Sequence, residues 1–429
     1  MTVRVGTWVA WCCAGFLWGA GMAGDRGGLP ALSAAEPIEV ELTAALQGFD
    51  GETCWVHARA GAIPPGAPGN AGRSPLVVMT MQKLLLSGSD VFYALNSLRS
   101  EDAGATWTGP LEQRPFVRQT IPSDPAVPLP TGAEIAPRLL QPGDETTVCD
   151  FTPKWHAATG RLLGTGQTVW YRGNKVLPVR PRGVAYAVYD APRHEWNPWK
   201  VLSLPDEPRF QNAGAGSGQR CDLENGDILI GVYHAVPGGR PYSTTVFRCR
   251  FDGETLRAVE HGPSLSVDVK RGLYEPSLAR CGGKFYLTMR NDERGYVAES
   301  ADGLRYGEPR VWRFDDGQEL GTYNTQQHWV VAGEELYLVY TRRGADNDHV
   351  FRHRAPLFLG RVDRERLCIV RSTERVLIPQ RGAGLGNFGV CEVSPDESWV
   401  IASEWMQPKG SERHGSDNSV WIAKVRSRP

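Results

Sequence analysis

The chain has 429 residues and a formal net charge of -1, so its length allows one large domain or two ordinary ones. The balanced charge gives no basic surface for nucleic acid and no acidic tail typical of disorder. Its 49 glycines, 31 prolines and 14 tryptophans indicate many turns and many large aromatic side chains, which favours an all-β protein over a helical one.

The first residues have the pattern of an export signal. Arg4 precedes a short apolar run that contains four glycines and ends among small residues suited to cleavage. We therefore expect a signal peptide over residues 1–24, a secreted or periplasmic mature protein, and no membrane association after cleavage. A transmembrane anchor is the alternative for this segment. Residues 25–45 are rich in Gly, Ala and Pro and are expected to form a linker. The predicted folded domain spans residues 46–429.

Along the predicted domain, short apolar strands alternate with turns that contain Gly, Asp or Asn. The strands are about 5–8 residues long, and no long segment shows the helical period of 3.6. Regular short strands favour radially repeated sheets, as in a β-propeller, over a pair of β-sandwiches. The expected strands are Pro75–Leu84, Val91–Leu98, Arg161–Tyr171, Val184–Tyr189, Asp227–Tyr233, Thr244–Phe251, Lys284–Arg290, Gly295–Ser300, Glu335–Thr341, Pro356–Val362, Ser398–Glu404 and Ser419–Val425.

Two turn motifs support the propeller. Ser100 to Trp107 fits S-x-D-x-G-x-T-W, and Ser300 to Tyr306 is a degenerate copy with Tyr in place of Trp. In such a turn Asp and Ser cap backbone amides, Gly adopts positive φ, and the aromatic ring packs onto the sheet. The motif resembles the Asp-box of sialidase-like proteins. The resemblance implies an all-β, six-bladed β-propeller, but it concerns the fold and not the activity.

Sialidase-like enzymes hold the carboxylate of the substrate sugar with three arginines and use an Asp acid and a Tyr nucleophile assisted by a Glu. The resemblance places the first arginine at Arg59, in the string H-A-R-A-G-A-I-P. It places the acid at Asp90, the only Asp between Arg59 and the first turn motif. An ordinary turn residue is the alternative for Asp90.

The remaining arginines are placed further along the chain. Glu275 precedes one predicted strand and Arg290 ends the next, which resembles the family segment that carries the Glu and the second arginine. An ordinary surface ion pair is the alternative. The third arginine is Arg354 or Arg352, which would point to one face of a strand, with His353 on the other. We favour Arg354.

An arginine cluster of this kind selects an anion. A guanidinium is always charged, and its planar fork matches a carboxylate. Converging forks would bind an acidic sugar such as a sialic or uronic acid, because a neutral sugar would leave them unpaired. The expected partner is therefore an acidic glycan.

The expected nucleophile is missing. No tyrosine follows Tyr340, and the segment where one belongs reads G-L-G-N-F-G-V, with Asn387 or Phe388 at the position. We count Asn387 among the substrate-binding residues. The reaction therefore departs from that of the family, and three alternatives remain.

The first alternative, which we prefer, is a glycoside hydrolase with altered chemistry, in which Asp90 and Glu275 supply the carboxylates. The second is a polysaccharide lyase that neutralises a uronate carboxylate and removes the C5 proton with a His or Tyr base. His328, in a polar and aromatic string, is the first candidate, and His57 and His156 are others. An ordinary packed or surface residue is the alternative for each of them.

The third alternative is a glycan-binding propeller without catalysis, in which the loop Trp196-Asn197-Pro198-Trp199 stacks on sugar rings; the same loop could equally pack between blades. No metal site or cofactor is expected. The string Asp346-Asn347-Asp348 lacks the spacing of a calcium loop.

Overall fold

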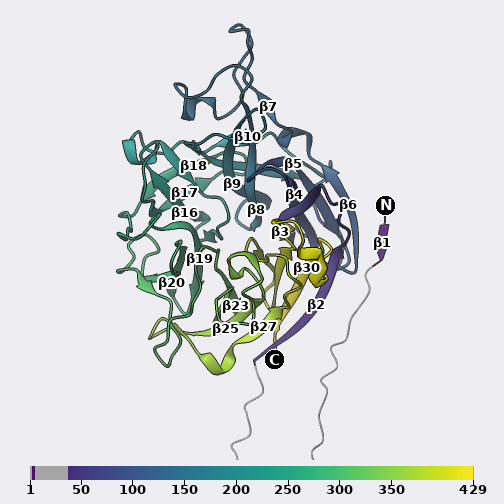
Figure 1. The fold of residues 1–429 in the computed structure, drawn as a ribbon, viewed down its shortest axis with the longest axis vertical. Helices are drawn as coiled ribbons and strands as arrows, with labels where there is room; N and C mark the ends of the chain where they lie inside the picture. Colours follow the sequence, from purple (N-terminus) through teal and green to yellow (C-terminus); the bar gives the residue numbers. More distant parts are fainter. Residues whose placement is uncertain (1, 5–36, 429) are drawn as a thin grey trace, which may run out of the picture.

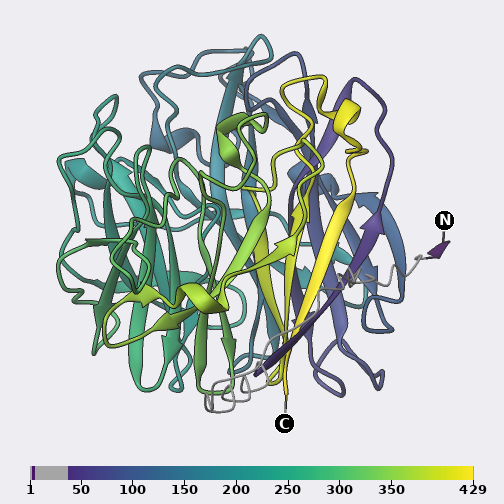
Figure 2. The same cartoon turned by 60° about the horizontal axis from the view of Figure 1, so that its bottom comes forward.

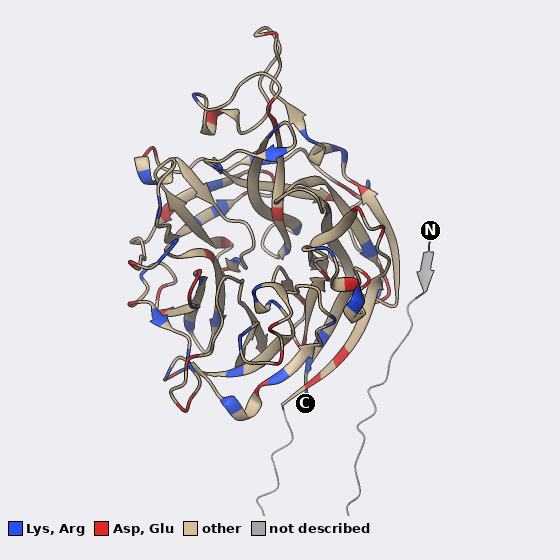
Figure 3. Cartoon of the chain, in the orientation of Figure 1, with Lys and Arg blue, Asp and Glu red and all other residues tan. Residues whose placement is uncertain are grey.

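The computed structural model describes residues 2–4 and 37–428. These residues form six antiparallel sheets arranged as a β-propeller around a central axis (Figure 1). In the turned view of Figure 2 the long strands stand side by side around the ring. Lys and Arg are interspersed with Asp and Glu over the ring (Figure 3), as the balanced charge predicts.

The first sheet comprises β1 (Thr2–Arg4), β3 (Thr53–Ile63), β4 (Leu76–Leu85), β5 (Phe92–Ser100) and β6 (Thr106–Glu112). The second comprises β7 (Gln119–Thr120), β8 (Glu145–His156), β9 (Arg161–Arg172), β10 (Lys175–Val176), β11 (Val184–Asp190), β12 (Glu195–Trp196) and β13 (Lys200–Val201). The third comprises β14 (Asn212–Gly214), β15 (Cys221–Asp222), β16 (Asp227–Ala235), β17 (Ser243–Phe251) and β18 (Leu256–His261).

The fourth sheet comprises β19 (Tyr274–Cys281), β20 (Lys284–Arg290), β21 (Tyr296–Ser300) and β22 (Arg310–Val311). The fifth comprises β23 (His328–Ala332), β24 (Glu335–Tyr340), β25 (Leu357–Asp363), β26 (Cys368–Ile369) and β27 (Arg375–Ile378). The sixth comprises β2 (Ile38–Leu46), β28 (Gly389–Ser394), β29 (Glu397–Ser403) and β30 (Val420–Ser427). Short 3-10 helices are η1 (Arg114–Phe116), η2 (Ala133–Ile135), η3 (Pro208–Phe210), η4 (Phe351–His353), η5 (Arg371–Thr373) and η6 (Ser411–His414).

The ring is closed by packing and by pairing. Each neighbouring pair of sheets shares a buried apolar cluster, including the pair formed by the first and sixth sheets. Strand β2 pairs with β30 along its whole length, from Ile38 opposite Ser427 to Leu46 opposite Val420. The two ends of the domain are thereby held in one sheet.

The domain begins earlier than the composition indicated. Strand β2 spans residues 38–46. Residues 38–45 of this strand belong to the segment predicted as a linker. Their pattern I-E-V-E-L alternates as a strand does, but the Gly, Ala and Pro before it concealed the boundary. The predicted signal peptide lies outside the described residues except for residues 2–4, which form β1. Within the part of the chain that is described, no helix has the length and apolar character to span a bilayer.

The two turn motifs make the interactions expected of them. Asp102 Oδ1 accepts hydrogen bonds from Ser100 Oγ (2.8 Å) and from the Thr106 amide (2.9 Å). Gly104 has φ 84, and Trp107 is buried with its ring 6.4 Å from that of Trp399. The second turn is held in the same way by Asp302.

The tryptophans of the loop Trp196–Trp199 are not available for sugar stacking. Both rings are buried, with 1% and 3% exposure, in the cluster between the first and second sheets. Of the two interpretations of this loop, sugar stacking is therefore wrong and packing between two sheets is confirmed.

Candidate functional site

Three inner strands depart from regular pairing at the centre of the ring. The pairing register shifts between Val56 and Arg59 in β3, between Cys149 and Thr152 in β8, and between Tyr274 and Ser277 in β19. Each irregularity holds one non-glycine residue with positive φ. They are His57 (φ 56), Asp150 (φ 55) and Glu275 (φ 47). Such a backbone is costly, persists only where the surroundings impose it, and gathers at functional sites.

The side chains of these residues line one cleft of about 640 Å³. Seven arginines and three carboxylates line it, so positive charge is in excess and an anionic ligand is favoured. The arginines are Arg180, Arg182, Arg240, Arg271, Arg290, Arg352 and Arg354, and the carboxylates are Asp90, Asp150 and Glu275.

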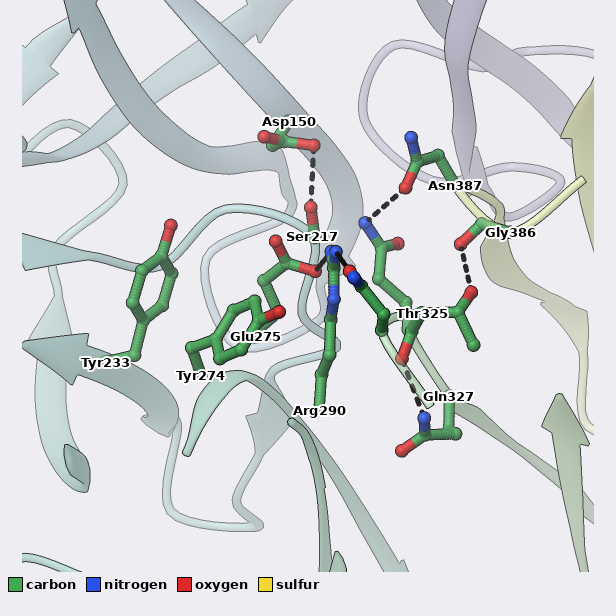
Figure 4. Close-up of polar contacts among 12 residues, drawn as sticks. Asp150, Ser217, Tyr233, Tyr274, Glu275, Arg290, Thr325, Gln327, Gly386 and Asn387 are labelled. Carbon is green, nitrogen blue, oxygen red and sulfur yellow. Dashed lines mark hydrogen bonds and ion pairs between the residues drawn. The ribbon is translucent and has the colours of Figure 1, made fainter. Parts of the chain in front are cut away.

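Glu275 and Arg290 form a largely buried ion pair at the cleft (Figure 4). Arg290 Nη1 donates to Glu275 Oε2 at 2.6 Å, and Arg290 Nη2 donates to Asn324 Oδ1 at 2.6 Å. The Arg290 side chain is 7% exposed and the Glu275 side chain 13%. The pair is therefore not the ordinary surface ion pair considered as its alternative. Asn324 is itself held at φ 48. A Glu at the start of one strand and an Arg at the end of the next thus do meet in the structure. Their role in a reaction stays a prediction.

Arg354 lies against this pair without a counter-ion of its own. Its Nε and Nη2 both donate to the Asn324 carbonyl, at 3.1 and 2.6 Å, and it forms no ion pair with any described carboxylate. Burial and the charges of Arg290 and Arg352 lower the pKa of Arg354 to about 9. A cation in this setting is poised for an anion supplied by a ligand.

The segment around Arg352 is not the strand that we predicted. Phe351–His353 form η4, and Arg352 has φ 57, so alternation along a strand does not decide where these side chains point. The loop is shaped by Asn347, whose side-chain amide donates to the Ala355 carbonyl at 2.7 Å. Arg352 and Arg354 nevertheless both line the cleft.

Asp150, which lines the cleft, accepts more side-chain hydrogen bonds than the other two carboxylates there. Its carboxylate accepts from Ser217 Oγ (2.6 Å), Arg59 Nη2 (3.3 Å) and Gln167 Nε2 (3.1 Å), and His57 Nε2 lies 3.3 Å away. Burial raises the pKa of Asp150, but His57, Arg59 and Ser217 outweigh it and hold the pKa below its ordinary value. Asp150 was not predicted from the sequence. Its only signal there is a charged residue between the apolar residues Cys149 and Phe151.

Other predicted residues divide into two groups. Asp90 and Asn387 line the cleft. Asp90 Oδ2 lies 2.8 Å from Arg180 Nη1, and both side chains are partly exposed. Asn387 Oδ1 accepts from Gln326 Nε2 at 3.2 Å. His156, in contrast, is buried in β8 and does not line the cleft.

Arg59 and His328 lie below the cleft and do not line it. Each residue is 1% exposed. Arg59 Nη2 donates to Ser217 Oγ and to Gln326 Oε1, both at 3.2 Å. His328 Nδ1 lies 3.0 Å from Ser277 Oγ. Arg59 contacts Asp150 and Gln326, and His328 Nε2 lies 3.3 Å from Gln326 Oε1. Both residues can therefore hold these two lining side chains in position without touching a ligand.

Tyrosines line the cleft although none stands at the expected position. Phe388 is buried, with its ring 4.7 Å from that of His328. On another wall, Tyr242 Oη accepts from Arg182 Nη1 at 3.2 Å. Burial raises the pKa of Tyr242, but Arg182 and neighbouring arginines outweigh it, so this pKa lies below its ordinary value. Tyr233 donates to Gln167 Oε1 at 2.6 Å. Tyr233 and Tyr242 lie in or beside the third sheet, whereas Asn387 and Phe388, where the resemblance expects a tyrosine, precede β28 in the sixth. A motif in the sequence therefore could not reveal them.

Buried histidines make stability depend on pH. Burial, and then Arg59, lower the pKa of His328 to about 3, and burial lowers that of His234 to about 4. An unfolded histidine takes up a proton below about pH 6.5, whereas these folded ones do so only near pH 3–4. We therefore expect the free energy of unfolding to fall as pH drops below 6.5, by up to about 1.4 kcal/mol per pH unit for each histidine.

Urea unfolding at a series of pH values between 7.5 and 5 tests this expectation. His328→Gln should flatten the dependence, whereas the control His414→Gln, at an exposed position, should leave it unchanged. Equal slopes in His328→Gln and the unmodified protein would contradict the assignment.

No protein-family profile and no curated protein sequence matches the chain. Solved structures do match in fold. A protein of unknown function from Dyadobacter fermentans is 15% identical, with a TM-score of 0.58 over 92% of this chain and 100% of that one. The NanB sialidase of Streptococcus pneumoniae is 12% identical, with a TM-score of 0.56 over 90% of this chain and 70% of that one.

A sialidase of Trypanosoma rangeli in complex with sialic acid is 15% identical, with a TM-score of 0.54 over 90% of this chain. This chain spans 58% of that protein's length, which is less than two thirds. At such identities the likeness concerns the fold alone. The chain is therefore an all-β propeller with a sialidase-like fold.

Proposed function

We propose that the protein is a glycoside hydrolase that acts on an acidic glycan, with the carboxylate of a sialic or uronic acid bound in the arginine-lined cleft. The observation that carries the proposal is Arg354, a partly buried cation that lines the cleft and has no carboxylate partner among the described residues. A planar guanidinium matches a carboxylate. The similar fold of the Trypanosoma rangeli sialidase, solved with sialic acid, supports this ligand class.

The cleft offers roles for five of the predicted residues that line it. Arg354 and Arg290, with Arg352 beside them, hold the sugar carboxylate. Asp90 is partly exposed at the cleft, where it can reach the oxygen of the leaving group and donate a proton to it. Glu275 fixes Arg290 and supplies the second carboxylate of the site.

The test is a screen of sialosides and acidic polysaccharides with product analysis by mass spectrometry. Hydrolysis adds one water to the substrate mass. We expect such products from the unmodified protein and none from Arg290→Ala, provided that the variant stays folded. Full activity in folded Arg290→Ala would refute the site assignment.

One observation favours a second candidate, a uronate lyase. Tyr242 lies among arginines that lower the pKa of its phenol, as a base that removes a C5 proton requires. Elimination would leave an unsaturated uronide that absorbs in the ultraviolet, whereas hydrolysis leaves none. Binding in calorimetry without any product would instead indicate a non-catalytic glycan-binding propeller.

We also propose that each of the six sheets is one blade. The support is the buried apolar cluster shared by each neighbouring pair of sheets. We further propose that the protein is exported to the periplasm or secreted. Mass spectrometry of the N-terminus of the mature protein tests cleavage near residue 24.

A further inference from the structure

A second groove adjoins the cleft on the side of the second and third sheets. Pro181 and Arg182 line both spaces, and the groove has a volume of about 840 Å³. One of its walls, residues 134–139, belongs to the segment between β7 and β8, which projects beyond the ring in Figure 1. Because these two residues line both spaces, the groove lies directly beside the cleft.

The groove is lined mainly by apolar side chains, among them Ile135, Val201 and Phe210. Leu139, on the projecting segment, is 40% exposed. Exposed apolar surface beside a polar cleft is typical of ligand-binding grooves. A sugar ring has apolar faces and polar edges, so it suits a groove of this composition.

A buried acceptor in the groove also requires a hydrogen-bond donor. Asn212 lines the groove and is 3% exposed. Its Oδ1 has no hydrogen-bond partner within the described residues. A buried acceptor without a partner is costly, and a rotation of the Asn212 side chain that turned its amide toward the groove would present the oxygen to a ligand hydroxyl.

We propose that this groove binds the sugar units that follow the acidic sugar, so that the substrate is a glycan chain and not a single acidic sugar on a small aglycone. The inference rests on the function proposed for the cleft. The apolar walls select sugar faces, and Asn212 accepts a hydroxyl. Arg182, at the junction, lies where the acidic sugar ends and the chain continues.

The test compares two substrates of the same acidic sugar, an aryl glycoside and an oligosaccharide of several units. Ser203→Trp places a large ring in the groove from an exposed position. It should lower kcat/KM on the oligosaccharide at least about tenfold and change that on the aryl glycoside by less than about twofold. Leu139→Ser should act in the same direction. The control Ser372→Trp, at an exposed position outside both cavities, should change neither value.

The outcomes separate the two proposals. If both substrates are cleaved and Ser203→Trp and Leu139→Ser affect them equally or not at all, the groove is not a subsite, while the function of the cleft stands. If the unmodified protein cleaves neither substrate, the proposed function fails and the groove assignment fails with it.

Discussion

Replacing Arg354 by alanine should lower kcat/KM on the acidic substrate by roughly 10²–10³-fold, as truncation of a charge-pairing group in a buried contact commonly does. The protein should not lose stability in proportion. Arg354 lies against Arg290 and Arg352, and their charges, together with burial, hold its pKa near 9. Removing it relieves like-charge repulsion, which offsets its hydrogen bonds to the Asn324 carbonyl. We expect the free energy of unfolding to change by less than about 1 kcal/mol.

Two further variants make this result specific. Arg354→Lys keeps the charge but loses the planar fork, so its activity should lie between those of the unmodified protein and Arg354→Ala. The control Arg342→Ala removes an arginine that pairs with Glu374 at 2.6 Å outside the cleft. It should lower the Tm and leave kcat/KM unchanged. An Arg354→Ala variant with undiminished kcat/KM would refute carboxylate binding at this arginine.

The two central strands of each sheet were predictable because their side chains follow the apolar pattern of burial. Every strand that we predicted matches a strand of the structure to within two residues at each end. They pack between sheets, so their apolar pattern reports burial alone. Strands nearer the sheet edges, among them β3, β8, β6 and β18, were missed, whereas β19 was expected after Glu275 without exact bounds. Strands β3 and β8 carry His57 and Asp150 at breaks in the ladder, and a polar residue in such a place interrupts the pattern by which strands are recognised.

In the candidate site, contacts within one hairpin could be predicted and contacts between sheets could not. Glu275 and Arg290 could be predicted because a single hairpin brings them together, so their spacing in the sequence determines their distance. Asp150 receives Arg59 from one sheet and Ser217 from another. Contacts of this kind depend on how sheets close into a ring, which local sequence does not encode.

Asp150→Asn should destabilise the protein by about 3–5 kcal/mol, the cost of removing one partner of a buried charge pair. The carboxylate accepts from Ser217, Arg59 and Gln167, and an amide cannot accept through its nitrogen. Arg59 is 1% exposed, and its Nε and Nη1 already have no partner in the described part of the chain. The variant would leave this guanidinium buried without a facing anion. Urea unfolding at pH 7 measures the loss.

The pH dependence has a definite sign. The folded pKa of Asp150 lies below its unfolded value, so its contribution to stability is present above about pH 4 and is lost as pH falls further. Asp150→Asn should therefore reduce stability at pH 7 more than at pH 3. The control Asp90→Asn alters a partly exposed pair with Arg180 and should cost less than about 1 kcal/mol.

A second substitution identifies the cause of the loss. If Asp150→Asn is destabilising because Arg59 is left buried and unpaired, then adding Arg59→Met should recover much of the lost stability, since an apolar side chain of similar length needs no counter-ion. A double variant no more stable than Asp150→Asn would show that the loss arises elsewhere, in the hydrogen bonds from Ser217 and Gln167. Recovery of stability without recovery of activity would mean that the Arg59–Asp150 pair is kept for the shape and charge of the cleft above it, not for the stability of the ring.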